Sequence, residues 1–128
     1  MGRIMDKWIC LIIGGVVGTL SRYGLTGVVS QRMGTGFPWG TMAVNITGCF
    51  VIGFLDIVFE KKFLLSQNYR MLLMTGFCGA FTTFSALMLE TSNLLKENQF
   101  LHAFGNVMLS ICIGFAAFKL GAVIAKMV

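Results

Sequence analysis

Four apolar runs dominate the chain, and each is long enough to cross a lipid bilayer as a helix. They cover residues 8–29, 38–59, 70–94 and 101–125. A hydrocarbon core of about 30 Å needs about 20 apolar residues per helix. With 56% hydrophobic and only 12% charged residues, a soluble domain of this length could not cover its own surface. The sequence therefore predicts one all-α membrane domain over residues 1–128 and excludes a soluble globular, disordered or disulfide-rich secreted protein.

Basic residues lie mostly at the ends of the runs, where they predict the orientation of the chain. Four crossings bring both termini and the middle connection to one side of the membrane. Because Lys and Arg are more frequent in cytoplasmic segments, we expect both termini in the cytoplasm. The first run is too long for a signal peptide, so we expect it to be retained. The side with the termini carries Arg3, Lys7, Lys61, Lys62, Arg70 and Lys126, and the other side carries Arg32 and Lys96.

Motifs typical of enzymes and metal centres are missing from the sequence. It contains no nucleophile–base pattern, glycine-rich phosphate loop or cluster of metal ligands. Cys10, Cys49, Cys78 and Cys112 occur one per run without paired spacing, so we interpret them as small buried hydrophobic residues. The chain is therefore not expected to be an enzyme.

Polar side chains inside the runs are costly in hydrocarbon, which makes them candidates for function. Arg22 either reaches toward the membrane surface or lies at a vestibule or subunit interface, where it attracts anions. Thr41 and Asn45 are four residues apart and share one helix face, which extends the candidate vestibule. The Asn45 amide either donates its N–H groups to an anion or bonds to another helix.

The third run is unusual in residues 75–85, where the sequence reads TGFCGAFTTFS. Two glycines, two adjacent threonines and a serine make a poor continuous helix. The pattern predicts either a broken helix with free carbonyl and N–H groups or a kinked helix whose hydroxyl groups bond to the preceding turn. Free carbonyl oxygens would suit a cation such as Na⁺, because they are hard ligands without charge.

Neutral hydrogen-bonding side chains accompany this motif in the second and fourth runs. Such groups suit a small, strongly hydrated anion, because they replace its water without trapping it by a full charge. Phe84 lies among them and either faces lipid or presents the electropositive edge of its ring to the anion. The candidate track consists of Asn45, Thr82, Thr83, Asn106 and Ser110.

These motifs together resemble the CrcB/Fluc family of fluoride channels over nearly the whole chain. The order of the motifs and the number of runs agree with the family, and the motif in the third run is the most specific. The matching pieces are residues 14–18 with Arg22 and Tyr23, residues 37–41 with Val44, Asn45 and Gly48, and residues 76–85 with Glu90.

The resemblance implies an antiparallel, dual-topology dimer of four-helix subunits in the lipid of the bacterial cytoplasmic (inner) membrane. Two narrow pores would export fluoride passively. The resemblance also implies a structural Na⁺ at the dimer centre, held here by the backbone carbonyls of Gly79 and Thr82. The pore-lining positions that it implies in this chain are Asn45, Phe84, Asn106 and Ser110.

Two departures from the family pattern leave the assembly open. Leu87 stands where the pattern has a second phenylalanine, so one electropositive ring edge is missing. The charge bias also differs from the near balance that is typical of dual topology. The chain is therefore predicted to pair with itself or, as a subunit of fixed orientation that is half-active or non-conducting, with a paralogue. A proton-coupled multidrug exporter is a weaker alternative, because the first run has no acidic residue after Asp6.

Overall fold

The computed structural model describes residues 2–61 and 66–128, which are almost entirely helical. Three long helices are α1 (Gly2–Met33), α2 (Trp39–Lys61) and α6 (Phe100–Met127). Between α2 and α6 the chain crosses once more in four consecutive pieces, which together form the third crossing. These are α3 (Gln67–Arg70), the π-helix η1 (Met71–Cys78), α4 (Gly79–Phe81) and α5 (Phe84–Lys96).

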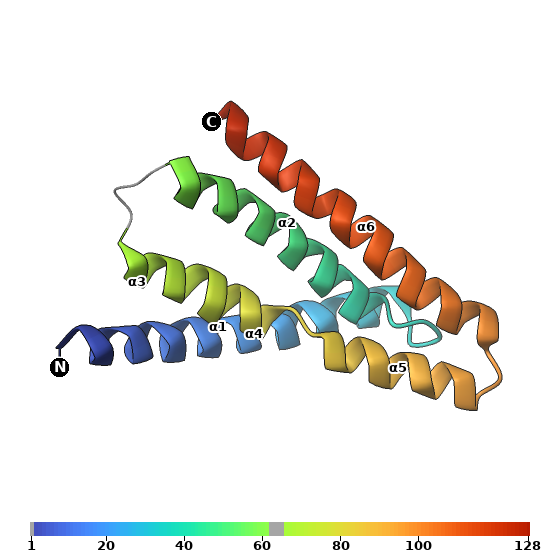
Figure 1. Cartoon of the computed structure of the whole chain (residues 1–128). Coiled ribbons are helices and arrows are strands. Elements are labelled where there is room, and N and C mark those ends of the chain that lie inside the picture. Colours follow the sequence, from blue (N-terminus) through green and yellow to red (C-terminus); the bar gives the residue numbers. More distant parts are fainter. Residues whose placement is uncertain (1, 62–65) are drawn as a thin grey trace.

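Four helical stretches of the described chain are long and apolar enough to span a membrane, as predicted. They are α1, α2, the third crossing and α6 (Figure 1). α1 is longer than the predicted run at both ends, because polar residues outside the apolar run continue the helix, and it ends only before Gly34. There the backbone turns to a φ of +86°, and the Gly34 N–H donates to Ser30 O at 2.9 Å. This positive φ is the usual way to end a helix.

Glycines allow the helices to pack closely in two pairs, α2 on α6 and α1 on η1 with α4 (Figure 1). A Cβ added to Gly121 of α6 would meet the carbonyl oxygen of Phe50 in α2. A Cβ added to Gly18 of α1 would meet the carbonyl oxygen of Phe77 in η1. Lipid provides no hydrophobic drive for helix association, so such close approach supplies the packing energy of the bundle.

Polar contacts join the helix ends on the side of the termini. Lys61 at the end of α2 donates from Nζ to the carbonyl oxygen of Lys126 at 2.8 Å, so it caps the last turn of α6. Arg70 of α3 lies 3.9 Å from Asp56 of α2. Part of the basic charge on this side therefore stabilises helix ends, and the cytoplasmic location of the termini stays a prediction. Lys62 lies outside the described residues.

The cysteines differ in burial. Cys78 is buried, Cys10 and Cys49 are half-buried, and Cys112 is exposed. Our interpretation of all four as buried residues is therefore wrong for Cys112. Its neighbours Ile111 and Ile113 are exposed as well.

Candidate functional site at the helix break

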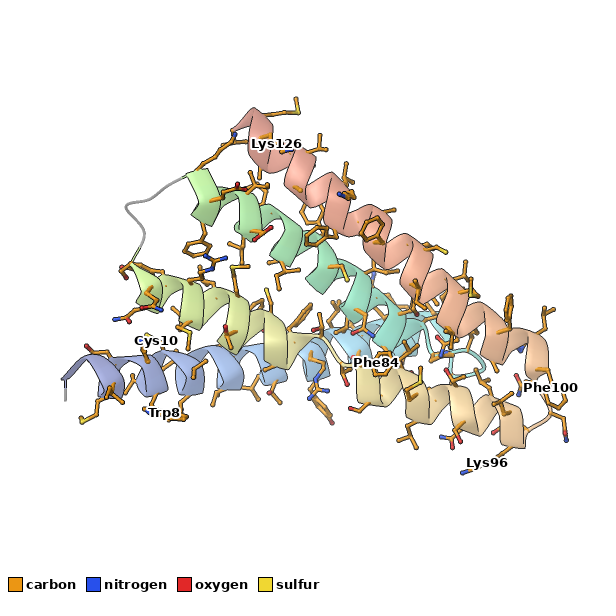
Figure 2. The ribbon with its side chains drawn as sticks, in the orientation of Figure 1. Trp8, Cys10, Phe84, Lys96, Phe100 and Lys126 are labelled. Atoms are coloured by element: carbon orange, nitrogen blue, oxygen red, sulfur yellow. The ribbon has the colours of Figure 1, made fainter. Side chains whose placement is uncertain are left out.

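The third crossing is interrupted at Thr82 and Thr83, which are both extended. Thr82 has φ −83° and ψ 155°, and Thr83 has φ −151° and ψ 114°. The Thr83 hydroxyl accepts from the backbone N–H of Ala86 at 3.2 Å, so Thr83 caps the start of α5. Of the two predicted alternatives, the broken helix is therefore the one that forms. Phe84 is the first residue of α5 and lies directly beside the break (Figure 2).

Asn45 of α2 supports the break by pairing with the backbone of Thr83. Its Nδ2 donates to the Thr83 carbonyl at 3.0 Å, and its Oδ1 accepts from the Thr83 N–H at 2.7 Å. Unsatisfied backbone groups cost several kcal/mol in a membrane, and these two bonds avoid that cost at Thr83. The amide therefore forms an interhelical bond, and its second N–H hydrogen remains for another acceptor.

Because of the bonds at Thr83, two carbonyl groups lose the N–H donors that they would have in a continuous helix. In a continuous helix the Thr83 N–H would bond to Gly79 O, but here it bonds to Asn45. The Ala86 N–H would bond to Thr82 O, but here it bonds to the Thr83 hydroxyl. Thr82 itself donates through both N and Oγ1 to Cys78 O, at 3.0 and 2.9 Å. The carbonyl oxygens of Gly79 and Thr82 are thus left without their helical donors.

A cavity of about 330 Å³ opens beside the break and is mostly apolar. Phe84 forms part of its wall, although 72% of this side chain is exposed on the single subunit. Ser110 reaches it from α6, and its buried Oγ has no hydrogen-bond partner among the described residues. The predicted site residues that line this cavity are Asn45, Gly79, Thr82, Thr83, Phe84 and Ser110, and Leu87 lines it as well.

Asn106 lies apart from this cavity, one turn from Ser110 on α6. It is 1% exposed, and its Nδ2 donates to the Thr91 hydroxyl at 3.1 Å. That hydroxyl donates in turn to the Leu87 carbonyl at 2.7 Å. Asn106 Oδ1 is buried without a partner in the part of the chain that the structure describes. Asn106 therefore holds α6 against α5 and keeps one free acceptor.

A second cavity, of about 350 Å³, lies on the other side of the break. Arg22, Thr41 and Thr83 line it together with Glu90, so the structure brings both predicted vestibule residues together. The Thr41 hydroxyl donates to Glu90 Oε1 at 2.6 Å, whereas Glu90 Oε2 is buried with no partner among residues 2–61 and 66–128. Thr83 lines both cavities and is the link between them.

Sequence reasoning missed the pairing of Thr41 with Glu90 and the support of Thr83 by Asn45. A partial signal exists in the spacing. Thr41 and Asn45 are one turn apart on α2, and Thr83 and Glu90 are seven residues, or two turns, apart on the facing segment. Each pair therefore shares one helix face, but the unequal intervals do not predict which residues meet.

The fold and site define a four-span helical membrane protein with a polar helix break between two cavities, an arrangement typical of channels and transporters. Comparison with known proteins gives the family. The family described as "CrcB-like protein, Camphor Resistance (CrcB)" matches residues 9–122, and the chain belongs to it. Together with its bacterial relatives, the four spans make the chain a multi-pass protein of the bacterial inner membrane.

Two relatives match almost end to end and carry the same name. A protein of Desulforapulum autotrophicum named "Fluoride-specific ion channel FluC" is 41% identical over 122 residues, which is 95% of this chain and 98% of the relative. A protein of Solidesulfovibrio magneticus with the same name is 38% identical over 125 residues, covering 98% of this chain and all of the relative.

Proposed function

We propose that this chain is a subunit of a fluoride-selective channel that lets fluoride leave the cytoplasm passively. The observation that carries the proposal is the cavity beside the break, which joins neutral hydrogen-bond donors to an aromatic ring. The names of the relatives, which are channels and not enzymes, support the same conclusion. Such a channel would keep the cytoplasmic concentration of a toxic anion low without spending energy.

Fluoride holds water tightly, so a selective path must replace that water with donors of similar strength. The free Asn45 N–H hydrogen, the Ser110 hydroxyl and the hydroxyl of Thr83 are neutral donors along the cavity. The edge of the Phe84 ring adds a weak positive potential. Neutral donors allow the ion to leave again, because no full positive charge in this cavity traps it. Asn106 lies one turn along α6 from Ser110 and outside the cavity, and we expect the path to continue past it.

Arg22, Thr41 and Glu90 would form the mouth of the path. The Arg22 guanidinium attracts anions into the second cavity, which Thr83 connects to the first. The Thr41–Glu90 hydrogen bond keeps that carboxyl group on one wall of the cavity. The positive charge thus lies at the mouth, where it raises the local anion concentration, and the narrow part has neutral groups.

A second subunit would complete the path. Phe84 is an exposed wall residue, so in one subunit the cavity is open on the side of this ring. We infer an antiparallel, dual-topology dimer in which the partner covers that side. The partner is a second copy of this chain or an oppositely oriented paralogue. In the second case this chain could be the half-active or non-conducting subunit, a role that the missing ring at Leu87 favours.

The break would also hold a structural Na⁺ between the two subunits. The carbonyl oxygens of Gly79 and Thr82 fit this role, because the bonds of Asn45 and Thr83 have taken their helical donors. Gly79 is also exposed on the subunit surface, where a second subunit can share the ion. The described residues contain no group of three or more acidic, histidine or cysteine ligands, so a cation here depends on backbone oxygens. When bound, the ion supplies positive charge that holds the two breaks together.

Release of fluoride from lipid vesicles that contain only this purified chain tests the proposal. A fluoride electrode follows release from one set of vesicles, and a chloride electrode follows release from a matched set. The channel proposal predicts rapid fluoride release with little chloride release. Equal release of both ions would contradict selectivity. Absence of release from the chain alone, followed by release after coexpression with a paralogue, would assign it the role of a partner subunit.

A further inference from the structure

One hydrogen bond joins α5 to α6 next to the cavity beside the break, and the proposed fluoride path does not use its acceptor. Asn106 Nδ2 of α6 donates to the hydroxyl of Thr91 in α5 at 3.1 Å. Among residues 2–61 and 66–128 no other side-chain hydrogen bond connects these two helices. Thr91 is therefore the polar group of α5 that contacts α6 where the path is expected to continue.

The bond lies one turn beyond the cavity on both helices. Leu87 of α5 lines the cavity, and Thr91 follows it by four residues on the same helix face. Ser110 of α6 lines the cavity, and Asn106 precedes it by four residues on the same face. The two helices pack against each other and run in opposite directions from a short connection (Figure 1). An ion that leaves the cavity between α5 and α6 therefore meets this bond.

The direction of the bond is fixed by a second hydrogen bond. A threonine hydroxyl has one hydrogen, and Thr91 donates it to the Leu87 carbonyl at 2.7 Å. Toward Asn106 the Thr91 oxygen can therefore only accept. The Asn106 amide must turn an N–H group toward α5, and its Oδ1 is left buried without a partner among the described residues. The Thr91 oxygen thus occupies the position beside this N–H group that an anion would take.

We propose that Thr91 competes with fluoride for the N–H group of Asn106, and that this competition keeps the ion from being held too tightly. A hydrogen bond to an ion is about twice as strong as one between neutral groups, so fluoride displaces the Thr91 oxygen. Thr91 takes the donor back when the ion moves on. A conducting site must bind weakly enough for the ion to leave, and Thr91 supplies that weakening. The inference rests on the proposed function, because it requires that the path passes Asn106.

The size of the effect follows from the strength of the competing bond. A site that is free for only a fraction of the time binds its ligand more weakly by that fraction. The net contribution of one neutral hydrogen bond corresponds to a factor of about five in an equilibrium constant. Removing the Thr91 oxygen should therefore strengthen fluoride binding at Asn106 about fivefold.

NMR of the side-chain amides in protein labelled with ¹⁵N-asparagine tests binding at Asn106 directly. The signal that is missing in Asn106→Ala belongs to Asn106, and sodium fluoride is added until this signal stops moving. In Thr91→Val the shift should be half complete at about one fifth of the fluoride concentration that the wild type needs. Thr91→Ser keeps the competing oxygen and should behave like the wild type.

Two further variants separate competition from altered packing. Thr91→Ala also removes the oxygen and should bind as tightly as Thr91→Val, although its side chain is smaller. Thr47→Val loses a hydroxyl that bonds only within α2, to Ala43 O, and should bind like the wild type. An unmoved Asn106 signal in the wild type, or unchanged or weaker binding in both Thr91→Val and Thr91→Ala, would overturn the proposal.

Fluoride release from vesicles loaded with increasing fluoride concentrations tests the consequence for ion flow. In Thr91→Val both the half-saturating concentration and the maximal rate should fall about fivefold, because the ion enters as before and leaves more slowly. The rate at low fluoride should stay the same, which a general loss of folded protein would not allow. An unchanged half-saturating concentration would contradict the role of Thr91. Absence of release from the wild type at every concentration would instead contradict the proposed function.

Discussion

α6 and the third crossing span the same membrane, but they use their backbones differently. α6 is continuous over 28 residues and contributes only side chains, such as Ser110, to the site. The third crossing stops at Thr82 and Thr83, where it exposes backbone groups. An unsatisfied backbone group costs several kcal/mol in hydrocarbon. A helix break of this kind therefore needs a side chain from another helix, and here that side chain is Asn45.

The largest effect is expected from Gly121→Val in α6. An added side chain would meet the Phe50 carbonyl oxygen and push α6 away from α2. Overpacking typically costs about 1–3 kcal/mol, and it costs more here because the clash is with rigid backbone atoms, so the yield of folded protein and its melting temperature in detergent should both fall strongly. Gly105→Val is the control on the same helix, because no atom lies within 4 Å of its added Cβ. Equal melting temperatures for the two variants would contradict the close packing of α6 on α2.

Asn45→Leu should affect the break rather than the bundle. It leaves the N–H and carbonyl groups of Thr83 without their partners, at about 1–3 kcal/mol for each group. If half of the summed cost, about 2 kcal/mol, appears in the barrier, fluoride release falls about thirtyfold. Thr47→Val is the matched control, because its hydroxyl bonds only within α2, to Ala43 O at 2.7 Å. A variant that releases fluoride as fast as the wild type would show that the break does not need Asn45.

Phe84→Ile compares an aromatic ring of the third crossing with one of α6. An aromatic edge contributes about 1 kcal/mol, so fluoride release should fall about fivefold while the melting temperature stays the same. Phe104→Ile is the control, since Phe104 is 66% exposed against 72% for Phe84 and lines neither cavity. Unchanged release in Phe84→Ile would remove this ring from the path.

The smallest effect is expected from Ser110→Ala, and its two readouts should move in opposite directions. The buried Ser110 hydroxyl has no partner among the described residues, so its removal should stabilise the fold by about 1 kcal/mol. The path loses one donor, and fluoride release should fall a few-fold. A lower melting temperature would mean that Ser110 forms a structural hydrogen bond, and unchanged release would mean that α6 contributes no donor here.

Most of the fold could be predicted from the sequence, because four apolar runs have few alternatives in a membrane. The break could also be placed within residues 75–85, since adjacent threonines and glycines are poor helix formers. The π-helix before it could not. No residue pattern in 71–78 distinguishes a π-helix from an α-helix, and the contact of this segment with Gly14 and Gly18 of α1 comes from another part of the chain.

The pairing inside the site depends on the register between helices, which no single segment contains. The candidate residue types at Asn45 and Thr83 could be predicted, but the choice between an anion and a backbone partner could not. Gly48 favours the backbone partner, because it allows α2 to approach Thr82 and so brings the Asn45 amide to Thr83. Thr41 and Glu90 are brought together in the same way, one turn further along α2.

The contrast between a broken and a continuous helix can be measured on two carbonyl groups at once. When the protein is labelled with ¹³C-carbonyl glycine and ¹⁵N-alanine, only Gly79–Ala80 and Gly121–Ala122 join a labelled carbonyl carbon to a labelled nitrogen. A ¹³C–¹⁵N correlation spectrum by solid-state NMR therefore shows two signals, one from the break and one from α6. If the freed carbonyl of Gly79 binds Na⁺, replacing Na⁺ by N-methylglucamine should shift its signal and leave that of Gly121 in place. Two unmoved signals, or two signals that move together, would contradict a cation site built from the break.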